Sequence, residues 1–308
     1  MIALDNQPFN IVNNIGFKRL LQGSLPLYEI PSDKFFREKI VPDIYNRCKE
    51  KLSFELSNEI EPAKLHLVIA DNAANMKKGF LLCNWAYEPC FIHSIQLVIQ
   101  DALKSQRTIT DIIAKSKRIF GHFGHSQLAS EKLKCIQEQL QLPVKKLIQD
   151  VDTRWNSTYY LLERLLEQKQ AINLYIIDKP DISDLTYHQW ELINNILNLL
   201  KPFEEITKIV SQRDSCISEI IPFICTLRKF LQTDSNIFSG VGSMKEDLLQ
   251  NINKRFTEYT IFNNKNLIIA TFLDPRFKDK FFDSEIMLNV IMHIIQEITN
   301  IQDNTEQK

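Results

Sequence analysis

The chain has 308 residues, and its 37 Lys and Arg nearly balance its 38 Asp and Glu to give a formal net charge of −1. This balance excludes a global field that would draw the chain to nucleic acid or to a lipid surface. Seven glycines and eleven prolines are few for this length, and the sequence has no glycine-rich phosphate loop or dinucleotide-binding motif. A β-sandwich or barrel is therefore not expected, and long helices are.

The cysteines and the first residues bear on the cellular compartment. Six cysteines are scattered without a C-x-x-C pair, which favours reduced thiols over a disulfide framework. Asp5 stands where a signal peptide would be apolar, and no apolar run reaches membrane-spanning length. These features predict a soluble intracellular protein.

The first part of the chain, residues 8–58, is predicted to form helices broken by prolines. Apolar side chains recur every three to four residues from Phe35 to Cys48, which is typical of an amphipathic helix. Pro42 is expected to kink this helix, and Ser32 is a candidate N-cap before it.

A short apolar run at residues 65–70 predicts a strand buried on both faces, as in a parallel sheet. The strand would end at Asp71, and a helix is expected from Ala74 to about Ala86. Residues 144–149 are a second candidate strand.

Most of the remaining sequence has helical periodicity. Helices are predicted over residues 92–103, 108–140 and 155–172. From residue 185 onward there is almost no strand signal, and apolar stripes predict several more helices.

Asp71 lies at the end of the predicted strand, where many α/β enzymes hold a metal-binding acid. Mg²⁺ takes oxygen ligands, but a two-metal phosphoryl-transfer site normally needs three converging carboxylates. Without further acids beside it, Asp71 can equally be interpreted as the N-cap of the following helix.

Cys90 and His93 have a spacing that also occurs in metal sites, but zinc needs four ligands. His122 and His125 are the nearest candidates to complete a set. The alternative is that Cys90 packs as a small hydrophobe and His93 lies at a helix start.

Arg154, Trp155 and Asn156 combine a guanidinium for phosphate, an indole for stacking on an unpaired base and an amide for a base edge. Residues 104–146 carry nine Lys and Arg against three Asp and Glu, which would suit phosphate contacts. The alternatives are that Trp155 anchors a helix in the core and that the basic segment is a solvated helix face.

The motifs, taken together and in order, resemble those of the hAT transposases and the BED-type zinc-finger proteins domesticated from them. The matching stretches are Gln7–Val12 with Gly16-Phe17, Ile30-Pro31-Ser32, Asp71–Met76, Cys90–Leu97, Asp150 with Thr153–Tyr159, and Leu273–Lys278. They span roughly 280 residues of the chain.

The resemblance implies an α/β fold that is predominantly helical, with a ribonuclease-H-like core and a large all-α insertion domain. It implies an N-terminal helical, DNA-binding and intertwined segment at residues 1–62, a partial ribonuclease-H-like domain at 63–172 and the insertion domain at 173–308. In this family three acids bind two divalent metals and cut DNA. Asp71 resembles the second acid.

The same resemblance implies that Cys90, His93, Arg154, Trp155 and Asn156 lie in the region that contacts DNA in this family. The tryptophan is expected to stack on the nucleic acid.

The chain also departs from the family pattern. No BED zinc finger precedes the first motif, and only residues 58–64 stand where the family has three strands and its first catalytic acid. The third acid and the dimerisation region are not found before Lys308, and Asp152 replaces a frequent proline. We therefore expect an incomplete core, an incomplete Mg²⁺/Mn²⁺ site, no zinc cofactor and no nuclease activity in a fragmentary or decayed relative.

The leading hypothesis is a nuclear, catalytically inactive, transposase-derived protein with residual DNA binding. A second is a helical interaction module, with apolar stripes of residues 185–260 pairing with a second copy or a full-length relative. A third, an active transposase or nuclease, needs acids that the sequence does not supply. No membrane partner is expected.

Overall fold

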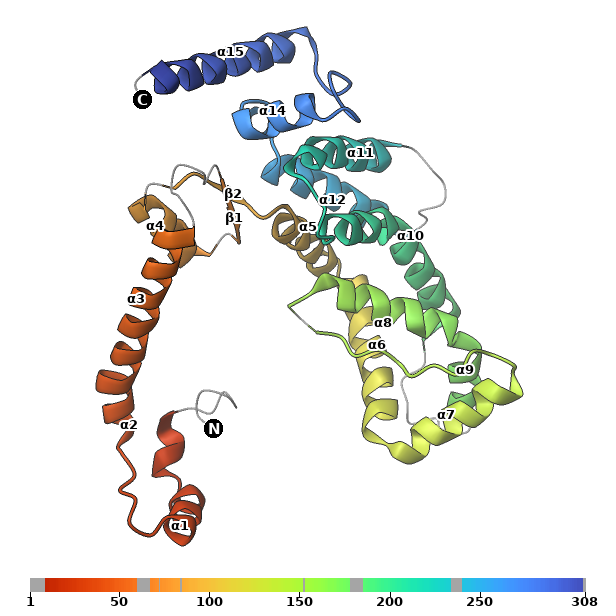
Figure 1. The fold of residues 1–308 in the computed structure, drawn as a ribbon. Helices are drawn as coiled ribbons and strands as arrows, with labels where there is room; N and C mark the ends of the chain where they lie inside the picture. Colours follow the sequence, from red (N-terminus) through yellow and green to blue (C-terminus); the bar gives the residue numbers. More distant parts are fainter. Residues whose placement is uncertain are drawn as a thin grey trace. The chain divides into compact units, whose positions relative to one another are not determined.

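The computed structural model describes residues 9–59, 67–71, 73–83, 85–151, 153–177, 185–233 and 240–306, and it is predominantly helical (Figure 1). The chain divides into two compact units, residues 1–69 with 75–88 and residues 70–74 with 89–308. Of the predicted features, Pro8, Asn72, Asp152 and residues 60–66 lie outside the described residues. No helix in the described part is both long and apolar enough to cross a membrane.

The smaller unit begins with short helices that follow the proline breaks. It contains η1 (Phe9–Asn13), α1 (Ile15–Ser24), α2 (Asp33–Phe35), the π-helical turn η2 (Phe36–Ile40) and α3 (Val41–Glu59). Ser32 caps α2, because its hydroxyl accepts a hydrogen bond from the Phe35 N–H at 3.2 Å, as predicted.

Pro42 changes the hydrogen bonding of this helix without ending it. A proline has no N–H to donate, and its ring clashes with the carbonyl four residues earlier. The preceding turn is accordingly π-helical, with the Val41 N–H donating to the Phe36 carbonyl five residues back. The predicted distortion at Pro42 therefore takes the form of a π turn.

Two short strands, β1 (Val68–Ala70) and β2 (Tyr87–Pro89), form a two-stranded sheet, and α4 (Ala74–Cys83) connects them. The Val68 N–H donates to Ala86 at 2.9 Å and the Cys90 N–H donates to Ala70 at 2.7 Å. Both strands advance in the same direction between these bonds, so the pair is parallel. Ile69 is 56% exposed, so the prediction of a strand buried on both faces is wrong for the described residues.

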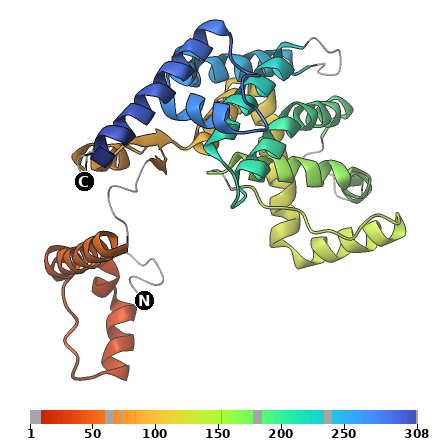
Figure 2. The same cartoon turned by 45° about the horizontal axis from the view of Figure 1, so that its top comes forward.

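The larger unit is built from helices that share one core (Figures 1 and 2). They are α5 (Phe91–Ser105), α6 (Arg107–His125), α7 (Gln127–Gln139), α8 (Trp155–Glu167), α9 (Lys169–Ile177), α10 (Tyr187–Val210), η4 (Ile217–Glu219), α11 (Ile220–Gln232), α12 (Gly242–Arg255), α13 (Glu258–Phe262), α14 (Lys265–Leu273) and α15 (Ser284–Glu306). α5 packs on α12 and α8 packs on α10. Residue 172, at the predicted boundary between two domains, lies inside α9 and within this core.

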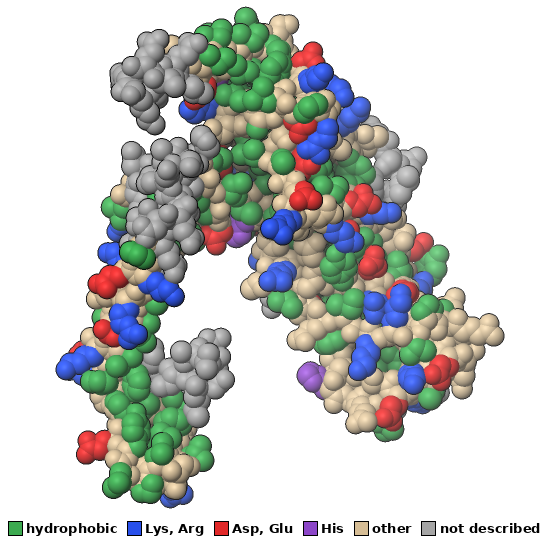
Figure 3. Space-filling view, in the orientation of Figure 1, with side chains coloured by type: hydrophobic (Ala, Val, Ile, Leu, Met, Phe, Trp, Pro, Cys, Tyr) green, Lys and Arg blue, Asp and Glu red, His purple; other side chains and the backbone are tan. Residues whose placement is uncertain are grey.

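The apolar stripes predicted in residues 185–260 form much of that core. Trp190, Ile193, Ile196, Ile224 and Leu227 are all 2% exposed or less. Burial removes them from any external surface, so the hypothesis that these stripes pair with another chain is wrong. On the face drawn in Figure 3, charged side chains of both signs are scattered among hydrophobic and other side chains of the larger unit.

Residues 144–149 are extended but form no strand, so this prediction is also wrong. Two of the carbonyl oxygens are held by side chains, Lys145 by the Gln137 amide at 3.0 Å and Lys146 by the Arg164 guanidinium at 2.5 Å. These bonds keep the segment extended against the helices in place of a neighbouring strand.

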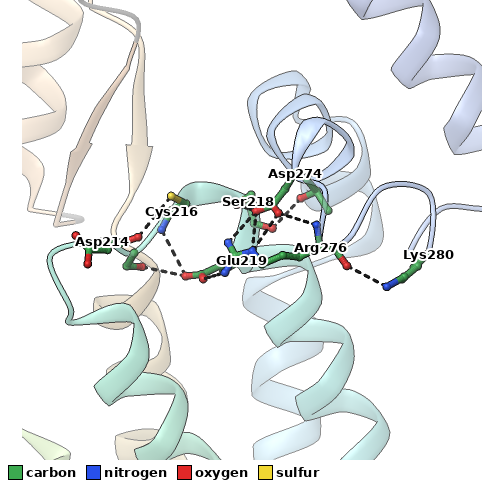
Figure 4. Close-up of polar contacts among 9 residues, drawn as sticks. Asp214, Cys216, Ser218, Glu219, Asp274, Arg276 and Lys280 are labelled. Carbon is green, nitrogen blue, oxygen red and sulfur yellow. Dashed lines mark hydrogen bonds and ion pairs between the residues drawn. The ribbon is translucent and has the colours of Figure 1, made fainter.

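A network around Arg276 joins the end of α14 to the start of α11 (Figure 4). The Arg276 guanidinium donates to Asp274 at 2.8 and 3.0 Å and to Glu219 at 2.8 Å. The Ser218 hydroxyl donates to Asp274 at 2.7 Å. Hydrogen bonds from Arg276 and Ser218 hold the pKa of Asp274 well below its usual range. The Asp-Pro-Arg-Phe motif thus closes a turn and fastens two helices.

We predict that Arg276→Met lowers the melting temperature at pH 7, because it leaves the Asp274 and Glu219 carboxylates together without their cation. Because folding lowers the pKa of Asp274, its stabilising contribution is complete above the unfolded value near 4 and declines as the pH falls below it. The difference between variant and wild type should therefore shrink at pH 3. Arg213→Met, on an exposed arginine, is the control, and equal melting temperatures for both variants at pH 7 would contradict the role.

Candidate nucleic-acid interface

Asp71 and Cys90 follow the two parallel strands and therefore come side by side. The Cys90 N–H donates to the carbonyl of Ala70, the residue before Asp71, at 2.7 Å. The exposed Asp71 carboxylate accepts a hydrogen bond from the Ala73 N–H at 3.2 Å, in the turn that leads into α4. This contact lies at the start of α4, so it supports the interpretation of Asp71 as a cap of that helix.

The described residues contain no group of three or more His, Cys, Asp or Glu that could hold a metal ion. His122, the candidate zinc partner of Cys90 and His93, instead lies 2.9 Å from the Tyr175 hydroxyl. Neither a zinc site at Cys90 nor a cluster of acids at Asp71 is assembled in this part of the chain.

Cys90 and His93 lie at the start of α5, and both are half-buried. The Cys90 carbonyl accepts hydrogen bonds from the Ser94 N–H at 3.0 Å and the Ser94 hydroxyl at 3.2 Å, so the backbone of Cys90 begins the helix. His93 lies one turn before Gln96, on the same face of α5. This face meets the second motif.

Gln96 joins α5 to the start of α8. Its side-chain amide donates to the Thr153 carbonyl at 2.8 Å and accepts from the Trp155 N–H at 3.1 Å. One side chain thereby satisfies both backbone groups that flank Arg154. Gln96 was not predicted as a site residue; its only signal is its place in the same motif, three residues after His93.

Asp150 organises the other side of this turn. Its side chain is 3% exposed and pairs with the Lys117 ammonium at 2.9 Å. The hydroxyls of Ser157 and Thr158 donate to it at 2.5 and 2.9 Å. Burial disfavours the charged carboxylate, but the bonds from Ser157, Lys117 and Thr158 outweigh it and keep the pKa of Asp150 below its ordinary value. Asp150 is therefore a neutralised structural anion.

Trp155, expected to stack on a base, is 1% exposed and belongs to the hydrophobic core. Its ring packs edge-to-face against Tyr159 at a centroid distance of 6.1 Å. In this conformation the indole has no free face for a base, so its burial supports the interpretation as a core anchor. A cavity of about 450 Å³ lies beside it, lined in part by Gln100, Lys104 and Lys117.

Unlike Trp155, Arg154 is exposed. Its side chain makes no hydrogen bond or ion pair with the residues that the structure describes. It precedes the first residue of α8, where the helix dipole favours anions. Asn156, in the first turn, is half-buried.

Further exposed cations in the basic segment also lack a carboxylate partner among the described residues. They are Lys104, Arg107, Arg118 and Lys146. Others are neutralised, as Lys117 is by Asp150 and Lys134 by Glu138. On α5, His93, Gln96, Gln100 and Lys104 follow one another at spacings of three and four residues, so they share a face. The result is a polar and basic strip along α5, with Arg154 beside Gln96.

Known proteins are similar to the chain throughout this region. Residues 88–199 match the family model described as the ZBED1 RNase-like helical domain. Over 99% of its length the chain is 25% identical to human zinc finger BED domain-containing protein 4 and 24% identical to mouse zinc finger BED domain-containing protein 6. It is 29% identical, over 64% of its length, to the putative AC transposase of Zea mays. The chain spans 32%, 40% and 25% of the lengths of these three relatives.

We predict that Gln96→Leu lowers the free energy of unfolding by about 1–2 kcal/mol, because the Thr153 carbonyl and the Trp155 N–H lose their partner. Urea denaturation measures this loss. Gln170→Leu, on an exposed glutamine of α9, is the matched control and should change stability little. If Gln96→Leu were as stable as that control, the amide would not be what joins α5 to α8.

Proposed function

Because this chain is a transposase-derived protein related to the BED zinc finger proteins and the AC transposases, we propose that it binds DNA in the nucleus without cutting it. The proposed contact surface is the strip formed by α5 and the start of α8. Its members are Cys90, His93, Lys104, Arg154 and Asn156.

The observation that carries this proposal is that Arg154 and Lys104 are exposed cations, and that neither has a carboxylate partner among the residues that the structure describes. Phosphate contacts supply most of the sequence-independent affinity for DNA, and they need cations that internal ion pairs have not neutralised. With a net charge of −1, attraction to DNA must come from such a local surface rather than from the whole chain.

In this proposal Trp155 supports binding through its position in the core. Its burial and the bond of its N–H to Gln96 fix the first turn of α8, and the residue before it, Arg154, is then directed to solvent. The guanidinium would pair with a phosphate, and the Asn156 amide would lie two residues further along, in the first turn of α8.

We also propose that β1, α4 and β2 belong to a partial ribonuclease-H-like domain at residues 63–172, that residues 173–308 form an insertion domain whose helices share a core with it, and that residues 1–62 form an N-terminal helical segment. The parallel β-α-β arrangement supports this, as does the match of residues 88–199 to a family model whose description names an RNase-like helical domain. In the resemblance to the hAT transposases, Asp71 at the end of β1 corresponds to the second catalytic acid.

We base the proposal that the chain does not cleave DNA on the residues around Asp71. A two-metal mechanism needs converging carboxylates, and among the described residues none forms such a group with Asp71. The Asp71 carboxylate is engaged instead with the Ala73 N–H.

We predict that the protein binds duplex or hairpin DNA in fluorescence anisotropy at low salt, and that Lys104→Ala with Arg154→Ala weakens binding by at least tenfold. Each lost phosphate contact should also reduce the slope of log K against log salt by about 1. Lys201→Ala, on an exposed lysine of α10, is the control.

Trp155→Ala is unsuited to this test, because removing a buried tryptophan costs about 3–5 kcal/mol of stability and would perturb the fold. No binding at low salt, or an equal effect of Lys201→Ala, would refute the proposed surface.

We predict no nicking of supercoiled plasmid by the purified chain in Mg²⁺ or Mn²⁺. Gel electrophoresis measures it, with a commercial nuclease as positive control. Metal-dependent nicking that Asp71→Ala abolishes would favour the alternative of an active nuclease.

A further inference from the structure

The cavity of about 450 Å³ beside Trp155 lies among α5, α6 and α8, and each of these helices contacts the other two (Figure 1). Small-molecule sites commonly have volumes of this order, and they combine an apolar wall with a few polar groups. The apolar part of the wall here comes from all three helices and consists of Leu103, Ile113, Ala114 and Trp155. The cavity is therefore of a size and character that suit a small ligand.

The indole of Trp155 carries a polar group that the chain leaves unsatisfied. Trp155 is 1% exposed, and its Nε1–H has no hydrogen-bond acceptor among the described residues. Native proteins rarely leave a buried donor in this state, because the donor has given up water without gaining another partner. Since Trp155 lines the cavity, an acceptor atom of a bound molecule could complete its hydrogen bonding.

The charged residues that line the cavity leave one positive charge in excess. The Lys117 ammonium and the Asp150 carboxylate pair at 2.9 Å and cancel each other. Lys104 also lines the cavity, and it has no carboxylate partner among the described residues. Trp155 is the first residue of α8, so the positive end of that helix borders the cavity too. The lining therefore favours a ligand with a single negative charge.

The hydroxyl groups in the lining already donate within the chain. Thr110 donates to the Arg107 carbonyl at 2.8 Å, and Thr158 donates to Asp150 at 2.9 Å. The Trp155 N–H and the Lys104 ammonium are thus the donors to which a ligand would be matched. A carboxylate suits both, because its oxygens accept hydrogen bonds and its charge balances the ammonium.

We propose that this cavity binds a small monocarboxylate with an apolar body. The body would lie against Leu103, Ile113 and Ala114, and the carboxylate would meet the Trp155 N–H and the Lys104 ammonium. Trp155 has no free face for stacking, so its contribution is the N–H at the edge of the indole. The site goes beyond DNA binding and does not rest on it, because Lys104 is the one member of the proposed DNA surface that lines the cavity.

Isothermal titration calorimetry of the full chain with naphthoate tests the proposal, and naphthamide is the uncharged probe of the same shape. We expect naphthoate to bind with a dissociation constant of about 0.1 mM, which is ordinary for a ligand of about 13 non-hydrogen atoms. Naphthamide should bind about tenfold more weakly, because it lacks the charge that Lys104 would balance.

Two pairs of variants separate the hydrogen bond from the charge. Trp155→Phe removes the N–H and should weaken naphthoate binding about tenfold. Trp190→Phe is its matched control, because Trp190 is 2% exposed and also has an unpartnered Nε1–H, but it does not line the cavity. This control should leave the affinity unchanged. Lys104→Met should remove the preference for naphthoate over naphthamide, and Lys104→Arg should keep it.

Ala114→Phe, at an exposed position of α6, places a ring in the cavity and should abolish binding. Circular dichroism establishes that each variant keeps its helix content. No binding of naphthoate at about 2 mM, well above the expected dissociation constant, would overturn the proposal. A folded Ala114→Phe variant that still binds naphthoate, or equal affinities for Trp155→Phe and Trp190→Phe, would also overturn it. Thymidine monophosphate that binds about tenfold more tightly than naphthoate would do the same, because the cavity would then belong to a nucleic-acid site.

Discussion

α5 and α8 share a hydrophobic core, and a single side-chain amide fixes the turn that leads into α8. Thr153 and Trp155 have backbone groups that face each other across the turn before α8, one an acceptor and one a donor. An amide can donate through its nitrogen and accept through its oxygen at the same time, and Gln96 does so at 2.8 and 3.1 Å. The direction of the neighbouring side chains follows, since Trp155 enters the core and Arg154 faces solvent.

The helices were predictable because their burial is set by local periodicity. The stripe from Trp190 onward and the N-cap at Ser32 need only residues within a few turns of each other. The joint at Gln96 was not predictable, because it links residues 57 and 59 positions apart. The extended segment at 144–149 is a related case, since its apolar pattern suits a strand but a strand exists only where another strand pairs with it.

Trp155 shows why a motif identifies a region better than it identifies a role. An indole at the first residue of a helix can face the core or the solvent, and the sequence of Arg154, Trp155 and Asn156 is the same in both cases. The core around Tyr159 decides the direction here. The same holds for the charged residues. Internal ion pairs neutralise some of them, as in Lys117–Asp150 and Arg276–Asp274. Only the structure distinguishes these from the cations that could contact a phosphate.

The helices α10 and α15 carry apolar stripes of similar spacing, but these stripes differ in how far they are buried. α10 is 24 residues long and is surrounded, so Ile193 and Ile196 are fully buried. α15 is 23 residues long and contacts α14, and five of its large apolar side chains, from Leu288 to Ile298, are 44–64% exposed. Periodicity alone cannot distinguish these cases, because it reports that a face is apolar and not what lies opposite.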